Sequence, residues 1–144
     1  MKKPNYDLHD KVYDQLRSEG YQGWGGNSHE ERMQGWKRAI ERMRAENMFP
    51  QSKDKILELG CGAGDVSLLF AEEGCDITGI DISPRAVQWA KDKFKEKELQ
   101  ADFIEGNVCD MEPVNSTSFD WVIDANCSPC IIGADRTKLF NEVH

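Results

Sequence analysis

From residue 55 onward, the apolar residues of this chain alternate between short continuous runs and runs with helical spacing. The short runs have the length and composition of buried strands and cover 55–59, 76–80, 102–105 and 121–124. Helices are expected between them over about 65–73 and 84–97, and a further helix begins near residue 134 or 135. Strands separated by helices predict an α/β fold with parallel strands and right-handed crossovers.

The first fifty residues follow a helical pattern. A short helix is expected over 10–18, and Asn27 or Ser28 is a good N-cap for a longer helix that extends to about residue 46. The apolar residues of the longer helix recur at spacings of three and four and form one stripe: Met33, Trp36, Ile40 and Met43. We therefore divide the chain into an N-terminal helical cap or lid, 1–50, and an α/β domain, 51–144.

Composition narrows the class of protein. The 144 residues are 39% hydrophobic and 31% charged, which is ordinary for one soluble globular domain. The formal net charge of −8 disfavours a nucleic-acid binder, which normally presents a basic face, and favours a small-molecule or protein substrate. No apolar run approaches the ~20 residues of a membrane helix, and the segment 1–7 lacks the apolar core of a signal peptide.

Five cysteines, an odd number, are scattered through the predicted strands and loops. This pattern favours reduced thiols, and together with the polar start of the chain it predicts a cytoplasmic protein. Cys127 and Cys130 form a CxxC pair, for which a redox or metal site competes with a plain loop. Because no second CxxC or nearby histidine pair completes a ligand set, we expect no metal site.

Candidate chemistry concentrates where the first predicted strand ends. This strand runs into glycines at positions 60, 62 and 64, a GxGxG turn before a helix, and the second strand ends on Asp81. Such a turn lets a ligand approach the backbone, and an acid at the tip of the next strand can bind two ribose hydroxyls. The dinucleotide fingerprint needs its third glycine at the position of Asp65. Asp65 and Glu58 would repel a pyrophosphate and attract a cationic ligand, which disfavours an NAD-dependent dehydrogenase.

Four motifs in order carry a resemblance to a known family: 58–64, 79–83, 102–108 and 119–126. Over roughly residues 50 to 144 the chain looks like the class I S-adenosylmethionine-dependent methyltransferases. The resemblance implies an α/β fold with a Rossmann-like parallel sheet flanked by helices and an N-terminal helical cap. It also implies the strand order 3-2-1-4 for the part present, without the last strands that the family usually has.

The same resemblance implies which residues contact the amino-acid end of S-adenosylmethionine. Gly60, Gly62 and Gly64, with Cys61 among them, would bring the backbone to the amino-acid tail. A tight turn packed against the sheet explains the same glycines without a ligand. Glu58 would attract the ammonium group of the tail, directly or through water, because an acid within an apolar strand needs a partner.

For the nucleoside end, the resemblance implies that Asp81 binds the ribose, with a helix cap as the competing role. Ile82 would offer the adenine an apolar face and Val108 a backbone amide, or both would only pack. Asn107 stands where the family usually has an acid, and its side-chain carbonyl can accept the same bond from the adenine amino group.

The methyl acceptor is expected beside the loop after the fourth strand, where ligands bind in open α/β sheets. Asp124 and Asn126 would be the catalytic residues that orient an acceptor hydroxyl or amine, and Asp124 would also contact the cofactor. Capping of the loop is the competing role. The segment 126–129 lacks the Asn/Asp-Pro-Pro-aromatic motif of relatives that methylate exocyclic amines, which further disfavours nucleic acid as the substrate.

Aromatic residues of the N-terminal segment look like a lid over the cofactor. Trp24 lies between glycines and, with Tyr13 and Tyr21, could present ring faces to the sulfonium cation. The alternative is that these rings only pack the first helix on the sheet. The three histidines show no ligand spacing and are expected at the surface: His9, His29 and His144.

Together these features predict an S-adenosylmethionine-dependent methyltransferase that transfers a methyl group in line to oxygen or nitrogen of a small molecule. S-adenosylhomocysteine would be the product. The alternative is a non-catalytic or truncated cofactor-binding module that needs a partner or a missing C-terminal half. Because the strand 121–124 would leave an apolar edge open, a homo-oligomer or domain-swapped dimer is also expected.

Overall fold

Four parallel strands form the sheet of the computed structural model, which describes residues 7–112, 114 and 119–144. The strands are β1 (Lys55–Leu59), β2 (Asp76–Asp81), β3 (Asp102–Glu105) and β4 (Trp121–Asp124). They lie in the order β3-β2-β1-β4, so the two middle strands are paired on both sides. This confirms the expected fold class and strand order.

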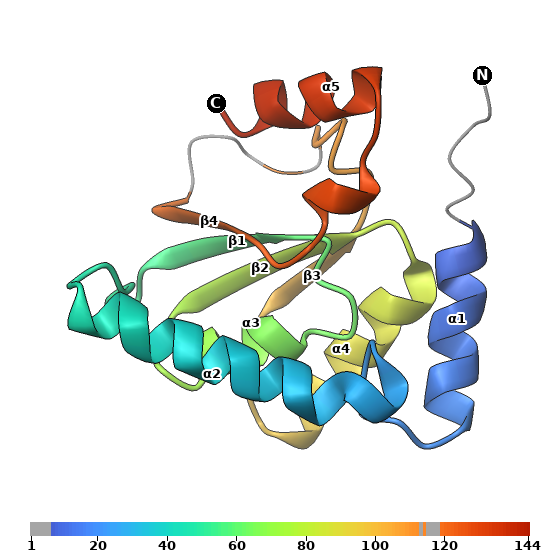
Figure 1. The fold of residues 1–144 in the computed structure, drawn as a ribbon, viewed down its shortest axis with the longest axis horizontal. Coiled ribbons are helices and arrows are strands. Elements are labelled where there is room, and N and C mark those ends of the chain that lie inside the picture. The colour runs from blue at the N-terminus through green and yellow to red at the C-terminus, as the bar shows by residue number, and fades with distance from the viewer. Residues whose placement is uncertain (1–6, 113, 115–118) are drawn as a thin grey trace.

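Helices cover both faces of the sheet (Figure 1). The α-helices are α1 (Asp7–Ser18), α2 (His29–Ala45), α3 (Asp65–Ala71), α4 (Pro84–Glu96) and α5 (Ala134–Glu142). Two short 3-10 turns, η1 (Gly26–Ser28) and η2 (Ser128–Cys130), were not expected. Figure 1 shows α2, α3 and α4 below the sheet and α5 above it. The sequence thus predicted every strand and α-helix, with bounds that differ by a few residues.

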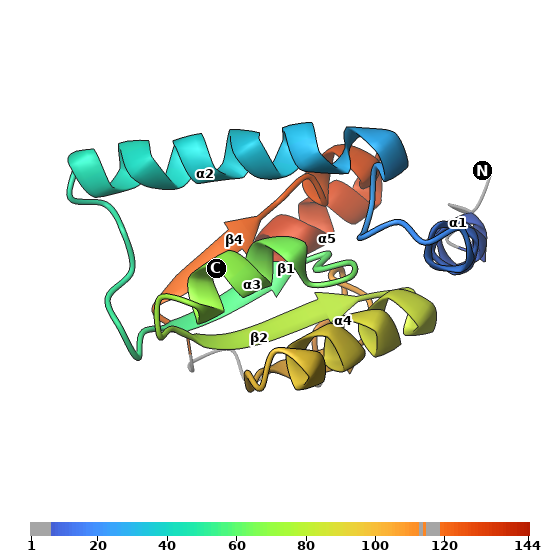
Figure 2. The same cartoon turned by 90° about the horizontal axis from the view of Figure 1, so that it is seen from below.

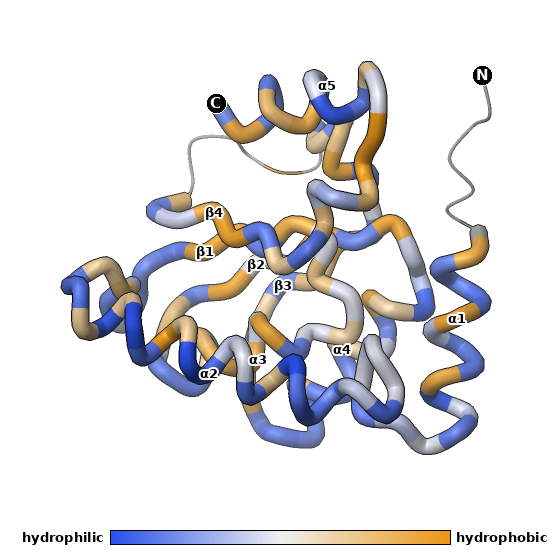
Figure 3. Tube along the Cα trace, in the orientation of Figure 1, coloured by the Kyte–Doolittle hydropathy of each residue, from blue (hydrophilic) through white to orange (hydrophobic). Residues whose placement is uncertain are grey.

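The alternation of side chains along the strands produces two apolar layers. One layer joins the strands to α3 and α4 and contains Ile56, Ile77 and Phe70, all essentially inaccessible to solvent. The other joins them to α5 through residues that include Leu57 and Leu139. Figure 3 shows the strands as mainly hydrophobic segments, while the longer α2 is largely hydrophilic. The sheet is therefore buried on both faces, as parallel sheets normally are.

The N-terminal helices reach the sheet domain from two directions (Figure 2). α1 lies beside α4, where Arg17 contacts Asp92 at 2.7 Å and the Ser83 hydroxyl donates to Asp10 at 2.7 Å. α2 forms an outer layer over α3. Ser28 is the N-cap residue of α2, one of the two residues expected there, although its side chain makes no capping hydrogen bond. The division at residue 50 stays a prediction.

The outer edge of β4 pairs with no other strand in the described part of the chain. Val122 on this strand is 45% exposed. None of the helices in the described ranges has the length and apolar character needed to cross a membrane. The prediction that the chain starts without a signal peptide was made for the segment 1–7, and residues 1–6 lie outside the described residues.

Candidate functional site

A cavity of about 440 Å³ lies where the carboxyl ends of β1, β2 and β4 meet the N-terminal helices. In a parallel α/β sheet this edge is the usual position for a ligand, because loops and helix N-termini converge there. The wall includes most residues that the sequence predicted: Trp24, Glu58, Gly60, Cys61, Gly62, Asp81, Ile82, Asn107, Val108 and Asn126. Gly64 and Asp124 are not part of the wall.

The glycine-rich turn after β1 forms the floor of the cavity. Gly60 and Gly62 have φ values of 62° and 53°, in the left-handed region that favours glycine. A Cβ atom on Gly60 would lie 2.7 Å from the Cys127 Cβ, and one on Gly62 would lie 2.5 Å from the Tyr13 hydroxyl. Neither position has room for a side chain, so the backbone itself faces the cavity.

Gly64 packs against the core rather than lining the cavity. A Cβ atom there would approach the Ala90 Cβ at 3.1 Å and the Phe103 ring at 3.3 Å. These residues belong to the core between α4 and the sheet. Gly64 therefore permits close helix–sheet packing, the role that the sequence left open as its alternative, and its contact with the cofactor tail stays a prediction.

Asp81 ends β2 and holds its carboxylate at the cavity wall, with 8% of the residue exposed. Its two oxygens accept the backbone N–H groups of Gly62 and Ser83, each at 2.9 Å. Burial raises the pKa of this carboxyl, while the two N–H donors oppose the shift. The cap of α4 is Ser83, whose hydroxyl accepts the Ala86 N–H at 3.1 Å. Each Asp81 oxygen keeps a lone pair for a further donor, such as a hydroxyl of a ligand.

Glu58 lies deeper, on the face of β1 that contacts α3, and only 3% of it is exposed. The Ser67 hydroxyl of α3 donates a hydrogen bond to its carboxylate. Burial raises the pKa of Glu58 to about 8, against the opposing effect of Ser67. Near neutral pH this carboxyl is thus largely protonated, and a cation bound beside it would favour its ionised form.

The loop after β3 and the start of the loop after β2 form one side of the cavity. Val108 is buried, and Ile82 is half-buried beside Asp81. The Asn107 side-chain carbonyl accepts the Cys109 backbone N–H at 2.9 Å, so this amide holds the loop as well as lining the cavity. One lone pair of that oxygen is left for a ligand.

Aromatic side chains from the N-terminal segment cover the cavity. The Trp24 ring stacks on His9 at 5.6 Å between ring centroids and meets Tyr13 at 5.2 Å. Tyr13 is buried, which raises the pKa of its hydroxyl. His9 and His29 are partly exposed, and both line the cavity, which was not expected. Their spacing in the sequence gave no signal of this, because the tertiary fold brings them to the wall.

The loop after β4 contributes Asn126 but not Asp124. Asn126 has a φ of 77° and lies in the wall. The exposed Asp124 carboxylate accepts the backbone N–H groups of Cys127 at 2.7 Å and Ser128 at 3.2 Å, and so holds the loop that leads into η2. This agrees with the competing role that the sequence allowed, and the expected catalytic and cofactor contacts of Asp124 stay predictions.

The CxxC pair belongs to the same turn. Burial raises the pKa of the Cys127 thiol to about 12, which disfavours the reactive thiolate of a redox site. Cys127 and Cys130 are free thiols. In the described ranges no three His, Cys, Asp or Glu side chains gather in a group that could hold a metal ion.

One wall of the cavity was not anticipated from the sequence. α2 contributes four side chains to it: His29, Arg32, Met33 and Trp36. Their spacing of three and four is the same signal that predicted an apolar stripe. The sequence could not show that this stripe ends over a cavity rather than on the core.

Comparison with known proteins identifies the family. A family model described as "Methyltransferase domain" matches residues 56–144. This range contains β1 from its second residue, the glycine-rich turn and all of β2, β3 and β4. The chain belongs to this methyltransferase domain family. The resemblance seen in the sequence is therefore confirmed.

The similar proteins carry names that refer to different substrates. The chain is 41% identical over 86 residues to an uncharacterized RNA methyltransferase of Protochlamydia amoebophila, covering 59% of this chain and 20% of that protein. It is 34% identical over 65 residues to a ubiquinone biosynthesis O-methyltransferase of Pectobacterium atrosepticum, covering 45% and 26%. A SAM-dependent methyltransferase structure from Methanosarcina mazei superimposes with a TM-score of 0.58 at 31% identity, covering 65% and 47%. The chain spans 20–28% of the length of the first curated relatives it matches.

Proposed function

We propose that the cavity binds S-adenosylmethionine and that the domain takes part in methyl transfer to oxygen or nitrogen of a small molecule. The observation that carries this proposal is Asp81, a buried carboxylate at the tip of β2 beside the glycine-rich turn. Its free lone pairs face the cavity where a ribose would present two hydroxyls.

The residues present fit this cofactor chemically. The backbone of Gly60 and Gly62 is accessible because neither position has room for a side chain. Glu58 supplies a carboxyl group whose ionised form a positively charged ligand would stabilise. Ile82, Val108 and Asn107 offer two apolar contacts and one acceptor on the side expected for the adenine.

When bound, the cofactor supplies an activated methyl group on a positively charged sulfur. The residues of this chain then act mainly by orientation, since in-line displacement depends on holding the two reactants at a short distance and a fixed angle. Trp24, His9 and Tyr13 cover the cavity and exclude water. No acid–base pair is required for a nitrogen acceptor that is already neutral.

A small-molecule acceptor is favoured over RNA, although one relative is named as an RNA methyltransferase. The net charge of −8 opposes a polyanion, and the cavity wall contains apolar side chains of α2 and of the β4 loop that suit a small molecule. Five free cysteines suit a reducing compartment such as the cytoplasm.

Calorimetric titration with S-adenosylhomocysteine tests the proposal. We expect the wild-type chain to bind, and Asp81→Asn to lose at least about tenfold in affinity because the amide replaces one acceptor oxygen by a donor. Asp76→Asn, at the exposed start of the same strand, is the matched control and should bind as wild type does. A folded wild-type chain without binding, or an Asp81→Asn variant with unchanged affinity, would refute the proposed site.

Turnover separates an enzyme from a cofactor-binding module. Both would bind S-adenosylhomocysteine, and only the enzyme would convert S-adenosylmethionine in the presence of an acceptor. Binding without turnover would support the module, completed by a partner or by further residues.

A further inference from the structure

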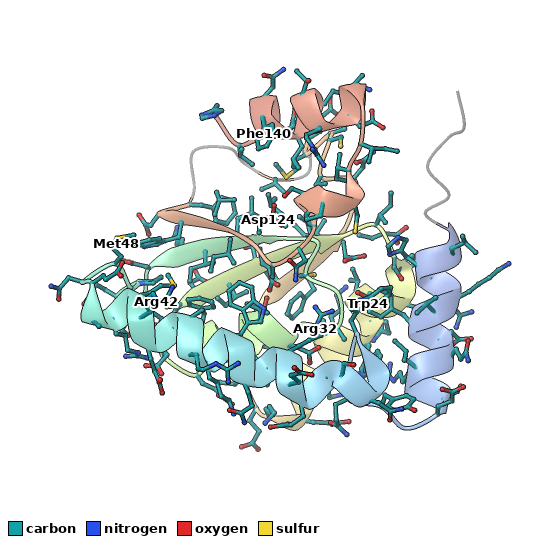
Figure 4. All side chains as sticks on the ribbon, viewed as in Figure 1. Trp24, Arg32, Arg42, Met48, Asp124 and Phe140 are labelled. Atoms are coloured by element: carbon teal, nitrogen blue, oxygen red, sulfur yellow. The ribbon has the colours of Figure 1, made fainter. Side chains whose placement is uncertain are left out.

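The cavity wall combines two groups of residues. Asp81 and the glycine-rich turn are assigned above to the cofactor. The part of the wall that α2 and the β4 loop contribute includes the apolar side chains of Met33, Trp36, Ala125, Pro129 and Ile131 beside the polar side chains of His29, Arg32 and Asn126. Arg32 and Trp24 lie on the sheet-facing side of α2 in Figure 4.

Arg32 is the single lysine or arginine in the cavity wall among the residues that the structure describes. It is half-buried, and within the same described ranges it forms no ion pair. A guanidinium that is partly withdrawn from water and lacks a counter-charge gains most from an anion that can accept two of its N–H groups.

The carboxylates of the cavity already have other partners. Asp65 lies 2.5 Å from the Lys93 ammonium and 3.3 Å from the His29 Nε2. Glu58 accepts the Ser67 hydroxyl, and Asp81 accepts two backbone N–H groups. Arg32 is therefore not the counter-charge of these acids, and its guanidinium is available to a ligand.

We propose that the acceptor carries an anionic group, a carboxylate or a phosphate, on an apolar body, and that Arg32 binds this group. Met33 and Trp36 follow Arg32 along the same helix and, with Ile131 across the cavity, supply an apolar surface for the rest of the molecule. The proposal rests on the function proposed above, since it assigns lining residues of the same cavity, contributed by α2 and the β4 loop, to the acceptor.

The cofactor's own carboxylate is the other anion that Arg32 could bind, and the test separates the two. We would titrate the ¹⁵N-labelled chain by NMR with benzoate and phenyl phosphate, and with their uncharged counterparts benzamide and phenol. Each titration is done with and without saturating S-adenosylhomocysteine. The variants are Arg32→Gln, Arg32→Lys and the matched control Arg38→Gln, an exposed position on α2 outside the cavity.

We expect an anionic probe to bind the wild-type chain at least about tenfold more tightly than its neutral counterpart. Arg32→Gln should abolish this preference, Arg32→Lys should retain part of it, and Arg38→Gln should leave it unchanged. The affinity for S-adenosylhomocysteine should stay within about threefold in Arg32→Gln.

Three results would overturn the proposal: no probe binding, equal binding of charged and neutral probes, or an anion preference that survives in Arg32→Gln. A loss of S-adenosylhomocysteine affinity in Arg32→Gln with the probe preference intact would assign Arg32 to the cofactor carboxylate. Failure of the wild-type chain to bind S-adenosylhomocysteine contradicts the proposed function, whereas the probe titrations without it test Arg32 by themselves.

Discussion

Glu58 places an ionisable group inside the apolar layer between β1 and α3. The Ser67 hydroxyl is its hydrogen-bond partner, and burial raises its pKa to about 8 from an ordinary value near 4.5. The unfolded chain therefore releases this proton at a lower pH than the folded chain does. The contribution of Glu58 to stability is fully present below about pH 4.5 and is lost as the pH rises through about 8.

This pH dependence gives a prediction for one residue. As the pH rises from about 5 to about 8, ionisation of Glu58 should lower the free energy of unfolding by on the order of 3 kcal/mol. Glu58→Gln should remove most of this pH dependence. Glutamine keeps an acceptor for the Ser67 hydroxyl but does not titrate. Denaturant unfolding of both proteins across this range measures the effect, with the exposed Asp76→Asn as control. Parallel pH profiles for wild type and Glu58→Gln would contradict it.

Single residues differ in how far the sequence specifies their role. The position of Asp81 at the cavity wall could be predicted because the strand, the glycine-rich turn and the acid lie within one continuous stretch. The role of Asp124 could not be chosen from the sequence, because a carboxylate at a strand tip either faces a ligand or holds the next turn, and the hydrogen bond to the Cys127 N–H is visible only in the structure. The positions of Arg32 and His29 in the cavity wall were not predicted, because the residues around them come from distant parts of the chain.

At the scale of elements, β4 is the least protected strand. Its outer edge carries backbone N–H and C=O groups that no strand in the described ranges pairs, and Val122 is 45% exposed. Such an edge favours pairing with another chain.

We predict that the isolated chain associates through this edge, as a dimer or a domain-swapped assembly. Light scattering should then give about twice the mass of 16.4 kDa expected for one chain. Val122→Lys should shift the assembly toward monomer by placing a charge at the edge, whereas Val12→Lys, at a 37% exposed position on α1, should not. A monodisperse monomer for the wild-type chain would refute this prediction.

Element boundaries were predictable where the chain carries its own stop and start signals. Ser83 and Pro84 mark the start of α4, and the Ser83 hydroxyl makes the expected cap. For α2 the cap residue was found without the cap bond, since Ser28 belongs to η1 and its side chain does not bond to the helix. Local composition thus located both helices but not the hydrogen bonds of both ends.

At the scale of the whole molecule, alternating strands and helices were enough to predict the parallel sheet, and the family resemblance gave its order. The way in which the N-terminal segment covers the cavity was not predictable in detail. The contacts that hold it join residues far apart in sequence, such as Asp10 with Ser83 and Lys93 with the Gln22 carbonyl. A lid was expected from the aromatic residues, while its partners follow only from the tertiary fold.

A crystal structure of the chain with S-adenosylhomocysteine would show whether the cavity binds the cofactor as proposed. We predict that the ribose hydroxyls lie within hydrogen-bond distance of the Asp81 carboxylate, that the amino-acid tail lies beside Gly60 and Gly62, and that Arg32 does not contact the cofactor. A ligand bound away from Asp81, or one whose ribose faces α2 instead, would contradict this prediction.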